Sequence, residues 1–237
     1  MQQSEAVQRS AVVFGVGPAR GLGAAIARRF ARENFRLTIL GRSAEKLGAS
    51  ADELRVSGAV VTSIVGDVTD AALVHAVIGA ADLPEAPLEA AIFNAGGNRP
   101  NGLLDMDAAF FENMWRVNAL AGLFFAQAAI KAMLPRKARR RAVHRRQRLA
   151  ARPRQFRRLR IGEGGPARHR AIRRPRIRPT RHPRRPRHPL LPALKEMRGP
   201  DGLLDPDAIA ENYWHLYQQP RSAWTHELDL RPWAETW

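Results

Sequence analysis

The chain has 237 residues, no cysteine and a formal net charge of +17. Its length suits one α/β domain with a substantial core, and the absence of cysteine excludes disulfide bonds and thiolate chemistry. No apolar run approaches the roughly 20 residues of a membrane span, and the N-terminus lacks the apolar core of a signal peptide, so we expect a cytoplasmic protein without a membrane partner.

The first ordered stretch is Ala11 to Phe30, AVVFGVGPARGLGAAIARRF. Its apolar run predicts a strand, its glycines predict a tight turn, and the pattern from about Leu22 predicts a helix. Glycine permits positive φ and lets a pyrophosphate approach bare backbone, while a helix N-terminus offers unpaired N–H groups to phosphate. This stretch therefore predicts a dinucleotide site, and an ordinary glycine-rich loop is the alternative.

Strand and helix patterns then alternate along the chain. Such alternation predicts parallel strands joined by right-handed crossovers, with ligand sites at the carboxyl ends of the strands. The expected strands are Arg36–Gly41, Ala59–Gly66 and Leu88–Phe93, and the expected helices are Ser43–Val56, with Ser43 as N-cap, and Asp70–Ala80.

Two motifs resemble those of the short-chain dehydrogenase/reductase family. The spacing Gly17-x-x-x-Gly21-x-Gly23 is similar to the family's cofactor turn, although Val16 stands where the family usually has Thr. Asn94-Ala95-Gly96 follows the fourth strand and resembles the family's Asn-Ala-Gly motif. The resemblance implies a Rossmann-like, doubly wound parallel sheet in a single domain. It also implies hydride transfer between a nicotinamide and a small-molecule carbonyl or alcohol substrate, and a homo-oligomer.

Polar residues at the strand ends indicate which cofactor binds. Arg42 follows the second strand, where a carboxylate would bind the ribose of NAD and an arginine suits the 2′-phosphate of NADP. Arg20 would add a second positive charge, although both arginines could be plain surface residues. Asp67 matches a family residue that contacts adenine, or else begins a turn before a helix capped near Thr69. We expect NADP, with NAD as the alternative, bound by Gly17, Arg20, Gly21, Leu22, Gly23, Arg42, Asp67, Val68, Asn94, Ala95 and Gly96.

A long helical pattern covers Asp107 to Leu134. Its apolar positions predict a buried stripe of Phe110, Met114, Val117, Ala121, Phe124 and Ala128. Asn118 matches the family's catalytic Asn, which holds a water molecule for a proton relay. Its side chain could instead only bond to the helix backbone.

The pattern breaks at residues 136–190, which hold 22 Arg, one Lys and one Glu. They carry a charge of +22, whereas the rest of the chain carries −5. The family requires here a fifth strand ending in Ser and a helix with Tyr-x-x-x-Lys, and neither Ser nor Tyr is present. We expect a Rossmann half at 1–135, an aberrant, poorly ordered segment at 136–190 replacing that strand and helix, and a C-terminal part at 191–237. The scattered histidines predict no metal site.

Two explanations of this segment remain open. One is a genuine arginine-rich arm that binds nucleic acid through its phosphates. The other is a frameshift in GC-rich coding sequence. One nucleotide later, the codon of Leu159 is compatible with Tyr or Phe, that of Glu163 with Lys or Arg, and that of Gln147 with Ser or Asn. We therefore expect an oxidoreductase by ancestry that is inactive or impaired as written.

The C-terminal part is again balanced in charge. Pro206 to Gln218 predicts a helix, Glu227 to Leu230 a last strand, and Tyr213, Trp214 and Trp224 are expected to be packing residues. A weaker alternative makes Tyr213 a substitute proton donor, although no lysine follows it at the required spacing.

Overall fold

A computed structural model describes residues 8–96, 103–134, 141–144, 199, 202–220 and 222–232. Its sheet has the order β3-β2-β1-β4-β5, and every pair of neighbours is parallel. Because the strand order reverses direction between β1 and β4, the sheet is doubly wound, as expected. The strands are β1 (Arg9–Phe14), β2 (Phe35–Gly41), β3 (Val61–Val65), β4 (Leu88–Phe93) and β5 (Arg141–His144).

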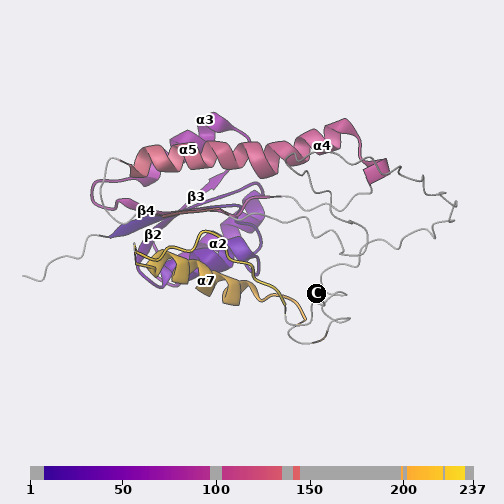
Figure 1. Ribbon diagram of the computed structural model, residues 1–237. Coiled ribbons are helices and arrows are strands. Elements are labelled where there is room, and N and C mark those ends of the chain that lie inside the picture. Colours follow the sequence, from indigo (N-terminus) through magenta and orange to yellow (C-terminus); the bar gives the residue numbers. More distant parts are fainter. Residues whose placement is uncertain are drawn as a thin grey trace, which may run out of the picture. The chain divides into compact units, whose positions relative to one another are not determined.

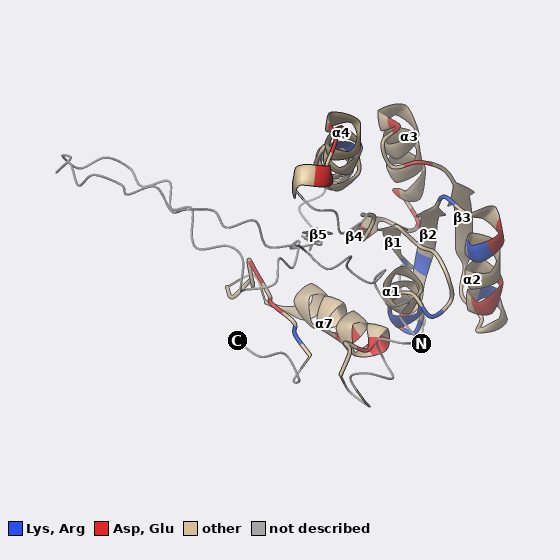
Figure 2. Ribbon diagram, turned by 90° about the vertical axis from the view of Figure 1, so that its right-hand side faces the viewer, with Lys and Arg blue, Asp and Glu red and all other residues tan. Residues whose placement is uncertain are grey.

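Helices cover both faces of the sheet (Figures 1 and 2). One face carries α1 (Leu22–Ala31), α2 (Ala44–Val56) and α7 (Pro206–Gln218), and the other carries α3 (Ala71–Ala81), α4 (Ala108–Trp115) and α5 (Ala121–Met133). Side chains alternate across a strand, so β1 supplies Ala11 and Val13 to the first core and Val12 and Phe14 to the second. Both faces of β1 are therefore buried, as in α/β proteins generally.

Short polar side chains cap several helices. The hydroxyl of Ser43 accepts a bond from the backbone N–H of Lys46 at 3.4 Å, which confirms Ser43 as the N-cap of α2. The cap of α3 is Asp70, next to Thr69, and its carboxylate accepts from the N–H of Leu73, which agrees with a cap near Thr69. Thr69 donates hydrogen bonds from its N–H and its hydroxyl to the carboxylate of Asp67. The Asp67 carboxylate thus holds the turn, and the Asp70 carboxylate caps the helix.

The predicted helix from Asp107 to Leu134 is interrupted by a π-helical segment, η2 (Arg116–Leu120), between α4 and α5. A π turn holds an extra residue, so it changes the helical register locally. Beyond it Ala121 and Ala128 are buried as predicted, but Phe125 is buried in place of Phe124, which is only half-buried. The other three positions of the predicted stripe, Phe110, Met114 and Val117, are also half-buried.

Two expectations about strands are wrong. The fifth strand is present as β5, where Ala90 of β4 pairs with Arg141. Strand pairing uses backbone N–H and C=O groups, which any residue except proline supplies, so an arginine-rich sequence does not prevent it. Glu227 to Leu230 forms no strand, and its alternate residues lack a buried face since positions 227–229 are exposed.

Of the three aromatic residues expected to pack in the C-terminal part, two are buried and one is not. Tyr213 and Trp214 are buried, as expected of packing residues, whereas Trp224 is 52% exposed. Apart from β5, the segment 136–190 lies outside the described residues, and so do Gln147, Leu159 and Glu163. None of the helices in the described ranges is long and apolar enough to cross a bilayer.

Candidate functional site

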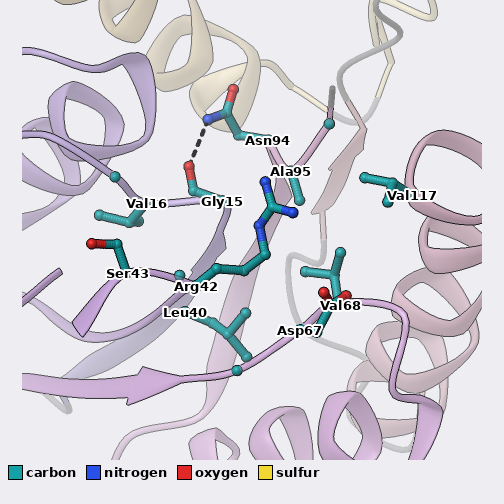
Figure 3. Close-up of a pocket in the computed structure, with 14 residues that line it drawn as sticks. Gly15, Val16, Leu40, Arg42, Ser43, Asp67, Val68, Asn94, Ala95 and Val117 are labelled. Carbon is teal, nitrogen blue, oxygen red and sulfur yellow. Dashed lines mark hydrogen bonds between the residues drawn. The ribbon is translucent and has the colours of Figure 1, made fainter. Parts of the chain in front are cut away.

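A pocket of about 220 Å³ opens at the carboxyl ends of four neighbouring strands, where the strand order reverses (Figure 3). This is the expected position of a ligand site in a doubly wound sheet. Its wall is formed by Gly15, Val16 and Gly17 after β1, Leu40 to Ser43 at the end of β2, Gly66 to Val68 after β3, Asn94 to Gly96 after β4, and Val117 of η2.

The glycine turn is packed tightly against its neighbours. Gly15 has φ +89°, and a Cβ there would lie 2.4 Å from the backbone nitrogen of Ala95. A Cβ on Gly23 would lie 2.5 Å from the carbonyl oxygen of Gly15. These two glycines therefore let β1, α1 and the loop after β4 approach each other closely.

Gly17 differs from them, because a Cβ there would meet no heavy atom within 4 Å. Packing of the chain therefore gives no reason for glycine at this position. The adjacent helix α1 begins after Gly21 with no side-chain cap bond and no acidic residue in its first turn. Its N-terminal N–H groups and positive dipole end thus form a potential anion site beside the open space at Gly17.

Asn94 connects the two central strands at the pocket. Its side-chain amide donates to the carbonyl of Gly15 at 3.1 Å, and its backbone N–H donates to the carbonyl of Phe14 at 2.9 Å (Figure 3). These bonds fix the start of the loop after β4, so Ala95 and Gly96 present their backbone to the pocket.

Arg42 and Asp67 give the pocket its charged groups. The exposed side chain of Arg42 extends into the space enclosed by the labelled residues in Figure 3. Partial burial raises the pKa of Asp67, but the two bonds from Thr69 and the charge of Arg42 outweigh it and lower the pKa overall. Asp67 is therefore a carboxylate at neutral pH, so this side of the pocket holds one positive and one negative group.

The structure brings together seven of the predicted cofactor residues: Gly17, Arg42, Asp67, Val68, Asn94, Ala95 and Gly96 line the pocket. Arg20, Gly21, Leu22 and Gly23 lie in the turn and at the start of α1 without lining it. Seven further residues line the pocket and were not predicted as cofactor residues: Gly15, Val16, Leu40, Gly41, Ser43, Gly66 and Val117. Ser43 could have been found from its position beside Arg42 at a strand end, whereas Val117 carried no such signal.

Asn118 lies in η2, next to Val117. Its side-chain amide donates to the carbonyl of Met114 at 2.8 Å, which is the backbone contact that the alternative interpretation expected. It does not line the pocket itself. A π-helical segment inside a longer helix is frequent at functional sites, because it displaces side chains from the regular helical register.

Both tyrosines of the chain lie on α7. Tyr213 is packed in the core shared with α1, and the hydroxyl of Tyr217 donates to Glu89 and accepts from Arg9 at 3.4 Å. Because Arg9 and Glu89 stand at the amino ends of β1 and β4, the Tyr217 hydroxyl lies at the opposite edge of the sheet from the pocket. Neither tyrosine lines the pocket.

In the part of the chain that the structure describes, no group of three His, Asp or Glu side chains could hold a metal ion. The pocket thus offers glycine backbone, one arginine, one carboxylate, one amide and the Ser43 hydroxyl, and the N-terminus of α1 lies beside it. This set suits the binding of an anionic ligand, and no Tyr or His is among the described residues that line it.

Comparison with known proteins gives a family match. A family model described as short chain dehydrogenase matches residues 11–143. Among curated proteins, gluconate 5-dehydrogenase of Gluconobacter oxydans is 29% identical over 120 residues, which are 51% of this chain and 47% of that protein. The chain thus spans about half the length of this curated relative.

Solved structures share the fold. A short-chain dehydrogenase from Rhodopseudomonas palustris gives a TM-score of 0.64 at 24% identity, covering 95% of this chain and 100% of that one. A variant of actinorhodin polyketide ketoreductase, solved with NADPH, gives a TM-score of 0.53 at 24% identity, covering 58% of this chain and 52% of that one. At these identities the likeness concerns the fold alone.

Proposed function

The chain belongs to the short-chain dehydrogenase family, and from this premise we propose that its pocket binds the dinucleotide NADP. When bound, such a cofactor supplies a nicotinamide that exchanges hydride with a carbonyl or alcohol carbon of a small substrate. The cytoplasmic location expected from the lack of cysteine, and a homo-oligomer, belong to the same proposal.

The observation that carries this proposal is the open space at Gly17. The position has no internal packing reason to be glycine, and it lies beside an uncapped helix N-terminus. A pyrophosphate fits that combination, because it needs close approach to bare backbone and is stabilised by the helix dipole. Ala95 and Gly96 present backbone on the other side of the pocket, where the nicotinamide ribose would lie.

Arg42 supports a preference for NADP over NAD. It follows β2 in the pocket wall, where NAD-binding proteins of this fold use a carboxylate to hold the 2′-hydroxyl of the ribose. A guanidinium there pairs with a 2′-phosphate, and the exposed Arg20 would add a second positive charge. Asp67, held by Thr69, would face the adenine side.

Titration of the protein with NADPH and with NADH, followed by nicotinamide fluorescence, tests the proposal. We expect tighter binding of NADPH, and loss of that preference in Arg42→Met. The matched control is Arg55→Met, because Arg55 lies in the last turn of α2, the helix that follows Arg42, pairs with Asp52 and does not line the pocket. Absence of binding by either nucleotide would refute the cofactor site, and equal affinities would refute the NADP preference.

We further propose that the chain as written turns over substrate weakly or not at all, because a frameshift has replaced its Ser and its Tyr-x-x-x-Lys. The absence of Ser and Tyr from residues 136–190 supports this, as does the position of both tyrosines on α7. Sequencing the gene across codons 136–190 tests the frameshift, and a shifted frame without those residues would contradict it. Steady oxidation of NADPH with any carbonyl compound would contradict the loss of activity.

A second candidate function is a cofactor-binding protein whose basic segment binds nucleic acid. The +22 charge of residues 136–190 favours it, because arginine-rich segments release counterions from phosphates on binding. It requires affinity for an oligonucleotide that falls steeply with salt and is lost when residues 136–190 are deleted. An oligonucleotide affinity that does not change with salt concentration would exclude this second function.

A further inference from the structure

Two carbonyl groups of the glycine turn are held by side chains from the helices beneath it. The guanidinium of Arg28, on α1, donates through Nη1 to the carbonyl of Ala19 at 2.6 Å. The hydroxyl of Ser50, buried on α2, donates to the carbonyl of Gly17 at 2.9 Å. The turn between Gly17 and Gly21 is thus attached to two different helices.

The bond to Ala19 also orients an N–H group. In a trans peptide the C=O and the N–H of the next residue point in opposite directions. Since the Ala19 carbonyl is directed at the Arg28 guanidinium, the N–H of Arg20 points away from that guanidinium. Fixing this carbonyl therefore also fixes the direction of one N–H donor in the turn.

The guanidinium of Arg28 is itself held on two further sides. It pairs with Glu53 of α2 at 3.4 Å and with Asp207 of α7 at 3.0 Å, and its side chain is only 21% exposed. One arginine thereby joins the glycine turn to α2 and to the first turn of α7. Three fixed contacts leave its donor to Ala19 little freedom to move.

We propose that Arg28 is a positioning residue that sets the conformation of the cofactor-binding turn. It acts through the Ala19 carbonyl, and Glu53 and Asp207 orient its guanidinium. The proposal deepens the NADP site proposed above and rests on it. Arg28 contacts no pocket-lining residue through its side chain in these bonds, so its effect on binding must pass through the turn.

The neighbouring Arg29 provides a matched control. It also joins α1 to α7, through Glu211 at 2.8 Å, and it lies over the ring of Trp214, but its ion pairs with Glu33 and Glu211 lie away from the glycine turn. Arg28→Met and Arg29→Met each keep an unbranched stem and remove a guanidinium that contacts α7. A purely structural role predicts the same consequence for both variants.

Titration with NADPH separates the two cases. We expect Arg28→Met to raise the Kd about tenfold, as expected when a bond that fixes a binding group is lost. Arg29→Met should leave the Kd within about twofold although it also lowers the melting temperature. Arg28→Lys retains one donor for Ala19 and should restore most of the affinity. Equal Kd values for Arg28→Met and Arg29→Met would overturn the proposal.

A measurement without nucleotide keeps this test separate from the proposed function. Hydrogen–deuterium exchange of residues 17–22 should be faster in Arg28→Met than in Arg29→Met, since only the first variant frees the turn. If the wild-type protein bound no NADPH, the cofactor proposal would fail while the exchange rates still decided whether Arg28 holds the turn. Identical exchange in both variants would show that it does not.

Discussion

The side-chain amide of Asn94 donates a 3.1 Å hydrogen bond to the carbonyl of Gly15, so the end of β4 is tied to the end of β1 at the point where the strand order reverses. One side chain thus holds together two neighbouring loops that both line the pocket. The bond spans 79 positions of sequence, and it gives this asparagine a structural task beside any contact with a ligand.

Replacing Asn94 with alanine should affect both stability and binding. We expect a loss of about 1 to 2 kcal/mol in the free energy of unfolding, because the bond is lost and the Gly15 carbonyl is left without this donor. The Kd for NADPH should rise about tenfold as the loop after β4 loosens. Asn212→Ala is the control, since its amide also donates to a backbone carbonyl, Ala208, but on α7. An Asn94→Ala protein with unchanged affinity would contradict the role given to this bond.

Alanine at Gly17 should lower the affinity for NADPH, whereas alanine at Gly23 should lower the stability of the fold. Gly17→Ala meets no atom within 4 Å, so the protein should fold with unchanged melting temperature and lose affinity for NADPH. Gly23→Ala would bring its Cβ to 2.5 Å from the Gly15 carbonyl, so it should lower the stability by about 2 kcal/mol or more. Thermal denaturation and NADPH titration of both variants check the pair, and tight binding by Gly17→Ala would count against the cofactor cradle.

Two helical glycines offer stabilising substitutions away from the site. Gly48 on α2 and Gly79 on α3 each have open space where a Cβ would lie. Alanine should stabilise the protein by about 0.5 to 1 kcal/mol at either position, because it lowers the entropy of the unfolded chain without a clash. Denaturant unfolding measures the gain, and NADPH affinity should not change.

Stability should depend on pH through Tyr217. Burial and the bond to Glu89 raise its pKa to about 12, so the folded protein holds the phenol proton more tightly than the unfolded chain does. The stabilisation is therefore complete below the unfolded pKa of about 10 and is lost as pH rises through the folded value. Denaturant midpoints measured from pH 9 to 12 should fall more steeply for the wild-type protein than for Tyr217→Phe. Parallel curves would contradict the raised pKa.

Much of the fold could be predicted because local signals agreed with the tertiary structure. Ser43 is both a good N-cap by residue type and the observed cap of α2, and the run from Leu88 to Phe93 forms β4 with the predicted bounds. The glycine spacing also placed the turn correctly, since φ +89° at Gly15 and the close contact at Gly23 leave few residue types acceptable.

The remaining features depend on contacts that local sequence does not encode. The π-helical segment at Arg116–Leu120 has no compositional signature. A regular helical period allows either Phe124 or Phe125 between Ala121 and Ala128, and Phe125 is the one that packs against Phe14 and Phe93 of the sheet. Pairing of β5 with β4 is a backbone contact between segments about 50 positions apart, from Ala90 with Arg141 to Phe93 with His144, so no local pattern signals it. The role of Arg28 depends on Asp207, 179 positions away, and no pattern within α1 points to it.

The docking of α7 against α1 has a consequence for how this chain tolerates change. The contacts that hold α7 in place, from Asp207 to Arg28, from Glu211 to Arg29 and from Tyr217 to Glu89, all reach residues that precede β5 in sequence. The entropic cost of bringing the ends of a connecting segment together grows only with the logarithm of its length, so halving the length of a connection changes that cost by about 0.6 kcal/mol. The contacts between the N-terminal half and α7 therefore do not depend on the sequence between β5 and α7. We expect that segment to tolerate large changes in length and sequence without loss of these contacts.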